Sequence, residues 1–262
     1  MRILESFLSR KQEAREQKLY ERKDDKEAQK RIEQLDKAAL TDELKNERLR
    51  LSVKLIEALA RLSIELEDNM SEYDTILSDD ASGRLVSLFL RHIINKSRER
   101  DDSEQKEDGI PAKPPIKTYF VATGYHRNKS KARAIEKFIE KKKAELGKVL
   151  VVTEYISSGA SVMKLVEILE KLNIDFNVAT VSANSLPYED SLQKRLIYGE
   201  VGNSGLAFYS KVFSSGVEKS SDTESPHPEA IRSEEAVKHV KTAREDMKML
   251  AGEISKIIKT DN

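Results

Sequence analysis

The chain has 262 residues, which is enough for one core domain with substantial extra structure, and 35% of them are charged. Lys plus Arg and Asp plus Glu both number 46, so the zero net charge gives no global electrostatic argument for binding nucleic acid or a membrane. Cysteine is absent, which excludes disulfides, thiolate metal sites and a cysteine nucleophile. Because there is no apolar run of about 18 residues and no signal-peptide pattern, we expect a cytoplasmic protein without a membrane span.

Residues 1–72 are expected to form a charged helical extension, because good helix formers dominate and Gly and Pro are absent. An amphipathic helix is predicted where leucines recur in steps of four, three and four residues, at Leu55, Leu59, Leu62 and Leu66. This apolar stripe should pack on the following domain or on a second copy in a short coiled coil. Because the charges are mixed and aromatic residues are nearly absent, the extension favours self-association over nucleic-acid binding.

Residues 73–215 are predicted to form an α/β core, in which helices flank a mainly parallel sheet. The first helix should close before residue 95, and ligands should bind beyond the carboxyl ends of the strands. Residues 216–262 should form a polar loop and then a long helix, residues 233–258, that docks on the core or on the N-terminal helices. The strands of the core are expected near residues 74–78, 117–123, 148–153 and 174–182.

A turn of small and acidic residues follows the first predicted strand. Its members are Asp79, Asp80, Ala81, Ser82, Gly83 and Arg84. Gly83 allows a close approach of the backbone, and the guanidinium of Arg84 is always charged and binds phosphate groups bidentately. A guanidinium suits pyrophosphate, although Arg84 could equally pair with Asp79 or Asp80, and the assignment of this turn to a pyrophosphate is implied by the family resemblance described below.

The third predicted strand is followed by a second turn of small residues. Residues 149–152 form an unbroken apolar run typical of a strand buried on both faces, and Glu154 follows where the strand should end. A helix with a clear apolar stripe begins after the small residues Ser157, Ser158, Gly159, Ala160 and Ser161. Backbone N–H groups, hydroxyls and the helix N-terminus together predict an anion site in this turn.

This stretch resembles the signature of the type I phosphoribosyltransferases, which is four apolar residues, two acids, two further residues and then Ser/Thr-Ser/Thr-Gly-Gly-Ser/Thr. Two positions depart, because Thr153 stands at the first acid and Ala160 at the second Gly. The resemblance implies that Thr153 and Glu154 face the ribose hydroxyls of phosphoribosyl pyrophosphate, and that residues 157–161 hold its 5′-phosphate. The loop matches better than the acid pair, so phosphate binding follows more directly than catalysis.

The resemblance implies roles for other parts of the chain as well. Glu154 and Arg84 would be the catalytic residues, and Mg²⁺ would arrive with the substrate and bridge its pyrophosphate and ribose. A mobile loop should supply a cation to the pyrophosphate, and the best placed basic residues are His126, Arg127, Lys129 and Arg133. The base pocket would include Tyr198, Phe208 and Tyr209, for which the alternative is a surface hairpin with packed aromatic residues.

Three functions are compatible with these residues. The first is an enzyme that transfers a phosphoribosyl group to a nitrogen base. The second is a non-catalytic sensor or regulator that keeps the phosphate site, which Thr153 and the large helical extension favour. The third is an interaction protein whose helices carry the function. The sequence leaves open the identity of the base, and whether the extension joins two copies or a foreign partner.

Overall fold

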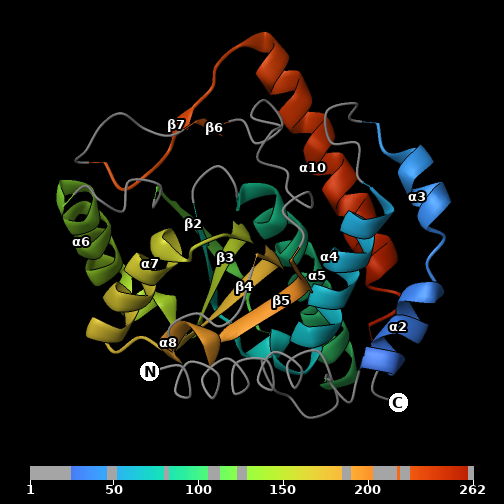
Figure 1. Ribbon diagram of the computed structural model, residues 1–262, viewed down its shortest axis with the longest axis horizontal. Coiled ribbons are helices and arrows are strands. Elements are labelled where there is room, and N and C mark those ends of the chain that lie inside the picture. Colours follow the sequence, from blue (N-terminus) through green and yellow to red (C-terminus); the bar gives the residue numbers. More distant parts are fainter. Residues whose placement is uncertain are drawn as a thin grey trace, which may run out of the picture.

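Five parallel strands form the central sheet, in the order β2-β1-β3-β4-β5 (Figure 1). The strands are β1 Thr75–Asp79, β2 Lys117–Val121, β3 Val149–Ile156, β4 Phe176–Ala183 and β5 Leu196–Val201. The predicted parallel α/β sheet is therefore confirmed. The computed structural model describes residues 25–45, 52–79, 83–105, 113–122, 129–184, 190–202, 217–218 and 225–258.

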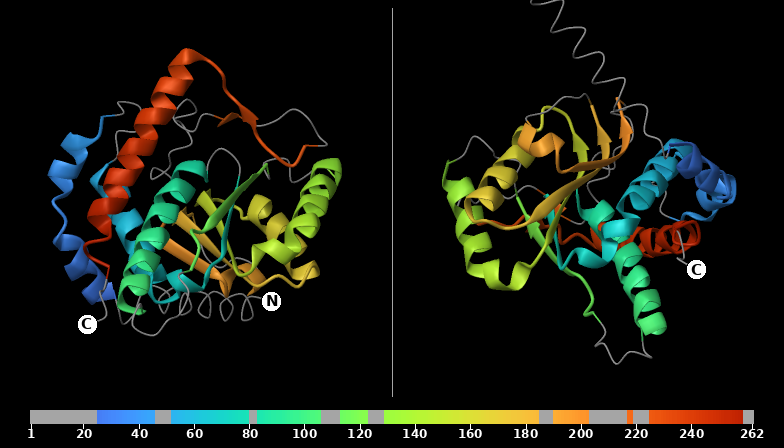
Figure 2. Two further views of the ribbon diagram at one scale, coloured as in Figure 1. Left: turned by 180° about the vertical axis from the view of Figure 1, so that it is seen from behind. Right: turned by 90° about the horizontal axis from the view of Figure 1, so that it is seen from below.

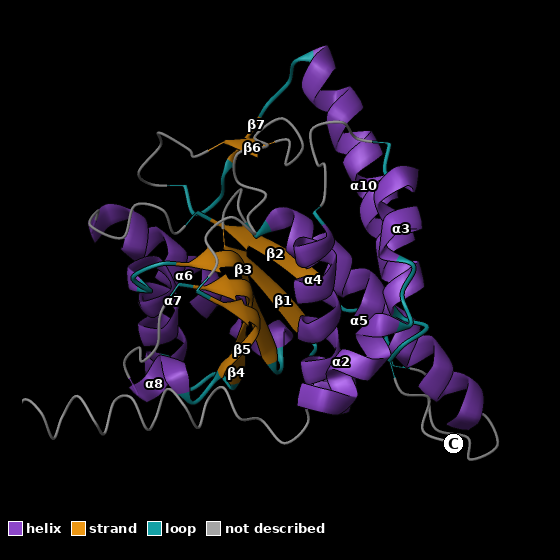
Figure 3. Ribbon diagram, turned by 45° about the vertical axis from the view of Figure 1, so that its right-hand side comes forward, coloured by secondary structure: helices purple, strands orange, loops and turns teal. Residues whose placement is uncertain are grey.

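Helices cover both faces of the sheet (Figure 3). Alternating side chains of β3 supply two separate cores, because Leu150 and Val152 pack with the first group of helices while Val149 and Val151 pack with the second. The first group is α4 Val53–Leu66 and α5 Arg84–Gln105, with α10 Glu234–Ile254 outside them. The second group is α6 Lys129–Leu146, α7 Ala160–Lys171 and α8 Asp190–Gln193. The sheet thus supplies the buried middle layer of a three-layer structure.

The N-terminal helices are part of the core that covers the first face. The leucine stripe of α4 is fully buried, so its predicted packing on the following domain is confirmed; a coiled coil with a second copy stays a prediction. Contact is so close at Gly199 of β5 that an added Cβ would lie 2.1 Å from the carbonyl oxygen of Ala58. Further outside lie α2 Asp25–Glu33, α3 Lys37–Glu43 and, after α4, the 3₁₀ helix Glu67–Glu72.

Two predicted elements differ from the structure. First, α5 continues through its charged second half to Gln105, because Arg98 is buried there and donates hydrogen bonds to the carbonyl oxygens of Tyr73 and Pro114. Second, the glycine-containing segment at residues 196–201 forms a fifth parallel strand, paired with β4, where no core strand was predicted; the rest of the suggested hairpin lies outside the described residues. Glycine weakens a strand on its own, but here it admits the backbone of α4.

The C-terminal helix was predicted correctly and joins both suggested partners. The Ser233 hydroxyl caps α10 by accepting a hydrogen bond from the Ala236 N–H at 3.2 Å. The helix lies along α5 (Figure 2), and the buried carboxylate of Asp246 accepts a 3.2 Å hydrogen bond from the Lys45 N–H after α3. Before α10, a short antiparallel pair is formed by β6 Val217–Glu218 and β7 Glu229–Ala230.

Candidate functional site

The strand order reverses between β1 and β3. From β1 the chain crosses through α5 to β2 on one side, and from β3 it crosses through α7 to β4 on the other side, over the opposite face. In sheets of this kind, the crevice for a ligand lies beyond the carboxyl ends of the two strands at such a reversal. Both turns that the sequence singles out, after β1 and after β3, leave the sheet at this point.

A side-chain hydrogen bond, in addition to the backbone pairing, links the carboxyl ends of β1 and β3. Ser78 pairs with Val152 in the parallel register, which brings the next residues, Asp79 and Thr153, side by side. The Thr153 hydroxyl donates to the Asp79 carboxylate at 3.3 Å, and both side chains are buried. A carboxylate from the neighbouring strand therefore lies beside the threonine that stands at an acid position of the signature.

Gly83 brings the start of α5 against the edge of the sheet. An added Cβ at this residue would lie 2.6 Å from the Val152 carbonyl oxygen and 2.9 Å from that of Asp79. Any larger residue would have to push the turn away from β3, so Gly83 permits a close approach to this strand, whereas its approach to a pyrophosphate stays a prediction. The contact with Val152 also shows that the turn after β1 reaches the strand that leads into the second turn.

A buried hydroxyl lies beneath the first turn. The side chain of Ser78 is fully buried, and its Oγ has no hydrogen-bond partner among the residues that the structure describes. This Oγ lies 3.0 Å from the position of a Cβ on Gly83. A polar atom that is buried without a partner is costly, which makes this hydroxyl a candidate donor to a ligand or to water at the turn.

The turn after β3 leads directly into α7. Gly159 occupies the cap position with φ +78°, a left-handed conformation that favours glycine. The Ser158 hydroxyl accepts a long hydrogen bond of 3.4 Å from the Ala160 N–H. Ala160 is the first residue of the helix and is exposed, so its methyl group fits where the signature has a second glycine. Ser157 and Ser158 are exposed as well, as a phosphate-binding turn requires.

Glu154 lies inside β3 rather than after it, because the strand continues to Ile156 beyond its predicted end at residue 153. Its side chain is fully buried. Alternation along the strand places Glu154 on the face of the sheet that α5 covers, together with Val152, and places Thr153 on the opposite face. Thr153 and Glu154, which stand at the two acid positions of the signature, therefore lie on opposite faces of the sheet.

Arg84 is the first residue of α5, and its guanidinium stacks on the ring of Phe120 at 4.3 Å from the ring centroid. It forms no ion pair with a described residue, so the alternative of a pair with Asp79 is not observed. Burial, and then the charge of Arg244, lower the pKa of Arg84 below its ordinary value. An anion bound at the turn would offset both unfavourable effects.

The other predicted site residues are placed only in part. Lys129 begins α6 and Arg133 is exposed one turn later, whereas Tyr198 is buried in the core between β5 and the second group of helices. Sequence reasoning missed Lys131, whose side chain is only 1% exposed near the start of α6. The sequence gives little indication that Lys131 is buried, because it lies in a stretch with several other lysines. The predicted residues Asp80, Ala81, Ser82, His126, Arg127, Phe208 and Tyr209 lie outside the described residues.

The donor set at the two turns fits a magnesium ion that arrives with its substrate. No group of three or more His, Asp or Glu side chains that could hold a metal ion occurs among the described residues. Mg²⁺ needs no such cage when one or two carboxylates and the phosphates of a substrate provide oxygen ligands. Among the described residues, Asp79 and Glu154 are the carboxylates at this edge, and because they lie on opposite faces of the sheet, one of them at a time could contact such an ion.

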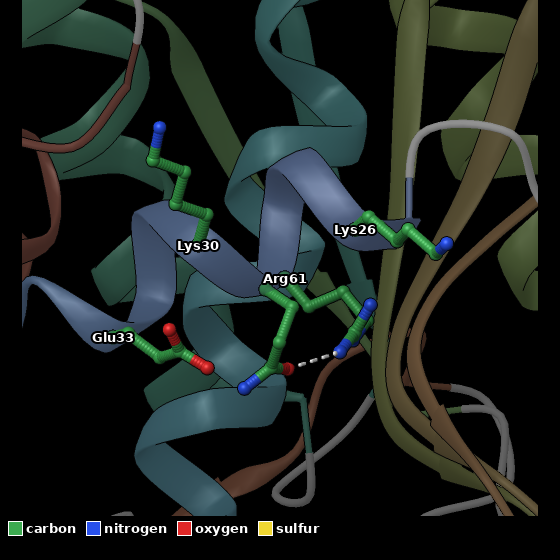
Figure 4. A pocket seen from close by; sticks show the side chains of 5 residues that line it. Lys26, Lys30, Glu33 and Arg61 are labelled. Carbon is green, nitrogen blue, oxygen red and sulfur yellow. Dashed lines mark hydrogen bonds between the residues drawn. The ribbon is translucent and has the colours of Figure 1, made fainter.

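A separate surface pocket of about 380 Å³ lies between α2 and α4 (Figure 4). Its lining residues are Lys26, Gln29, Lys30, Glu33 and Arg61. Gln29 accepts a 3.1 Å hydrogen bond from Arg61, and the two lysines extend in different directions. The pocket has mixed charge and contains none of the predicted site residues, so the candidate site is the edge at β1 and β3.

No protein-family model matches the chain, and no curated protein shows significant similarity to it. Within the part of the chain that the structure describes, every helix is too short or too polar to cross a membrane.

Proposed function

We propose that this chain is a phosphoribosyltransferase-like protein, which binds phosphoribosyl pyrophosphate or a nucleoside 5′-phosphate and transfers the phosphoribosyl group to a nitrogen base. One observation carries the proposal: β1 and β3, which are each followed by a turn that resembles a phosphate-binding turn in sequence, are neighbours at the reversal of strand order. The approach of Gly83 to the Val152 carbonyl oxygen supports their forming one site.

The parts of the substrate are assigned from the chemistry of each turn. The 5′-phosphate lies at residues 157–161, where exposed hydroxyls and the N-terminus of α7 provide donors and positive partial charge. The ribose hydroxyls lie near Glu154, and the carboxylate of Asp79 takes the place of the acid that Thr153 replaces. The pyrophosphate lies at the turn of Gly83 and Arg84.

The reaction needs stabilisation of the leaving group more than it needs a strong nucleophile. A ring nitrogen of the base forms a bond to C1 of the ribose, while the bond from C1 to the pyrophosphate oxygen breaks and its electron pair leaves with pyrophosphate. A proton carried by that nitrogen passes to solvent. Arg84 neutralises the departing charge, and Mg²⁺ bound to the substrate adds to this neutralisation when present.

A second candidate is a sensor that binds the phosphoribosyl group without transferring it. The hydrogen bond from Thr153 to Asp79 favours a sensor over an enzyme. It directs the threonine side chain to the neighbouring strand, and Glu154 is then the one acid that remains from the signature. An interaction protein that acts only through its helices is the third candidate, and it requires no ligand at the edge of the sheet.

Calorimetric titration with phosphoribosyl pyrophosphate and Mg²⁺, followed by an assay of pyrophosphate release with a panel of bases, separates the three candidates. Binding with turnover supports transfer, and binding without turnover supports the sensor. If the ligand does not bind, and wild type and Glu154→Ala behave alike, then both are excluded.

A further inference from the structure

A row of cations lies where α5 and α10 run side by side (Figure 2). We name it the α5–α10 cationic stripe. Its members are Arg84 and Lys96 on α5, and Arg244 and Lys248 on α10, and the imidazole of His92 lies beside them. Arg244 acts electrostatically on Arg84, Lys248 acts on His92, and Lys96 lies beside Gly252 and Ser255. The two helices therefore run in the same direction, and the stripe extends for about 18 Å along α5, at 1.5 Å per residue.

No described residue forms an ion pair that neutralises the positive charge of the stripe. None of its members forms an ion pair with a carboxylate among the described residues, although described lysines elsewhere, such as Lys148 and Lys164, do. Burial lowers the pKa of His92, and the charges of Arg91, Lys248 and Lys96 lower it further. Neighbouring cations without counter-charges raise the free energy of the folded state, and a bound anion would recover it.

We propose that the α5–α10 cationic stripe binds the phosphate backbone of a single-stranded nucleic acid, independently of its base sequence. Arg244 and Lys248 are about one turn apart on α10, and Arg84 and Lys96 are about 18 Å apart along α5, so the cations form an extended row rather than a pocket for one phosphate. Lys96, Arg244 and Lys248 are exposed, and so can reach a chain that lies along the surface. The mixed charges of residues 1–72 gave no sign of this surface, because the cations belong to two helices far apart in the sequence.

A phosphate chain fits the stripe better than an acidic protein does. Protein interfaces draw most of their affinity from buried aromatic or apolar anchors. The large apolar side chains that are exposed in the described structure are Val53 and Val237, and only Val237 belongs to α10, about two turns before Arg244. Counter-ion release from phosphates needs only cations, which the stripe provides.

The test is fluorescence anisotropy with a labelled oligothymidylate and a labelled oligouridylate of about 12 nucleotides, at salt concentrations from about 50 to 200 mM. We expect the logarithm of the binding constant to fall with the logarithm of salt, with a slope of about −2 to −3, since each single-strand phosphate contact contributes about −0.7. The double variant Arg244→Ser/Lys248→Ser should bind at least about tenfold more weakly and lose about 1.4 from that slope.

The matched control is Lys137→Ser/Lys141→Ser on α6, which removes two exposed cations with the same spacing from the other side of the sheet. It should bind as wild type does, and the charge-preserving variant Arg244→Lys/Lys248→Arg should too. The proposal is overturned by absence of binding at the lowest salt, by equal loss in the control, or by equally tight binding of polyglutamate, which would indicate an acidic protein partner.

The two proposals share Arg84, but this test separates them, because Arg244 and Lys248 have no role in the phosphoribosyl proposal. If the double variant weakens only the binding of phosphoribosyl pyrophosphate while oligonucleotides do not bind to wild type, then the stripe merely attracts a small anion and the nucleic-acid proposal is wrong.

Discussion

Two arginines in this protein stack on aromatic rings in nearly the same way, at opposite edges of the sheet. Arg195 lies 4.4 Å from the ring centroid of Phe176 at the amino edge, and Arg84 lies 4.3 Å from that of Phe120 at the carboxyl edge. Arg195 also donates to the Phe176 carbonyl oxygen at 3.0 Å and lies 3.7 Å from the Asp175 carboxylate. Arg84 has neither kind of partner within the described structure, and its charged neighbour is another arginine.

The two edges differ in the same way as the two arginines. At the amino edge, Lys148 pairs with Glu72, Lys113 pairs with Asp74 at 3.1 Å, and the Lys148 N–H donates to Asp74 at 3.0 Å. The carboxyl edge instead combines two short turns, a helix N-terminus and an arginine that has no counter-charge among the described residues. Satisfied charges stabilise a structure, whereas unsatisfied ones at a crevice indicate a site for a ligand.

The largest effect should follow from placing a negative charge in the turn after β3. Ser158→Asp should weaken the binding of phosphoribosyl pyrophosphate by about 100-fold or more, because two like charges at about 4 Å repel by up to about 4 kcal/mol near a protein surface. Ser71→Asp adds the same charge at the amino edge, where the residue is also exposed, and should leave the affinity unchanged. Calorimetry measures both, and equal losses would show that the ligand does not distinguish the edges.

Removal of Arg84 should have the next largest effect. Arg84→Ala should lower kcat/KM for pyrophosphate release by about 100-fold, as loss of one stabilising donor does in other enzymes. For a sensor without turnover, the affinity for the ligand falls instead. Arg195→Ala is the matched control, since it removes a stacked arginine of the same geometry and should change only stability. A greater functional loss in Arg195→Ala would contradict the assignment of the edges.

The amino edge should respond in stability rather than in function. Gly147 has φ +57°, and a Cβ there would lie 2.2 Å from the Asp74 carboxylate oxygen that receives the Lys148 N–H. Gly147→Ala should therefore lower the free energy of unfolding by about 1–2 kcal/mol, through left-handed strain and displacement of Asp74. Denaturant unfolding measures the change. Unaltered stability, or altered ligand affinity in the folded variant, would count against a purely structural role.

The smallest effect is a pH dependence at His92, beside the α5–α10 cationic stripe. Burial first, and then Arg91, Lys248 and Lys96, hold the pKa of His92 below its ordinary value of 6.5. The unfolded chain therefore binds this proton more readily, so the contribution of His92 to stability is fully present above pH 6.5 and is lost as the pH falls through the folded pKa. Unfolding curves of wild type and His92→Gln should converge on acidification, and parallel curves would contradict the shift.

The sequence predicted the elements that depend on local patterns. The apolar run of β3, the leucine stripe of α4 and the capped helix α10 follow from spacing and propensity alone. Local propensity did not predict β5, because Gly199 disfavours a strand on its own. In the structure this glycine allows the backbone of α4 to pack against β5. Local propensity failed also at α5, where the charged second half is held by the buried Arg98.

The sequence predicted the two turns of the candidate site, but not that they follow neighbouring strands at one edge of the sheet. The position of Asp79 beside Thr153 depends on strand order and register, which no stretch of sequence contains. The burial of Lys131 and the meeting of Arg84 with Arg244 likewise depend on tertiary packing. Residues that act together from distant segments are therefore the part of the site that only the structure revealed.

Amide hydrogen exchange with phosphoribosyl pyrophosphate and Mg²⁺ tests most directly whether the carboxyl edge at β1 and β3 is the binding site. The predicted result is slower exchange at Gly83 and in residues 157–161 once ligand is added, with no change at Lys148 and Val149 on the amino edge. Protection confined to the amino edge, or no protection anywhere at saturating ligand, would contradict the account.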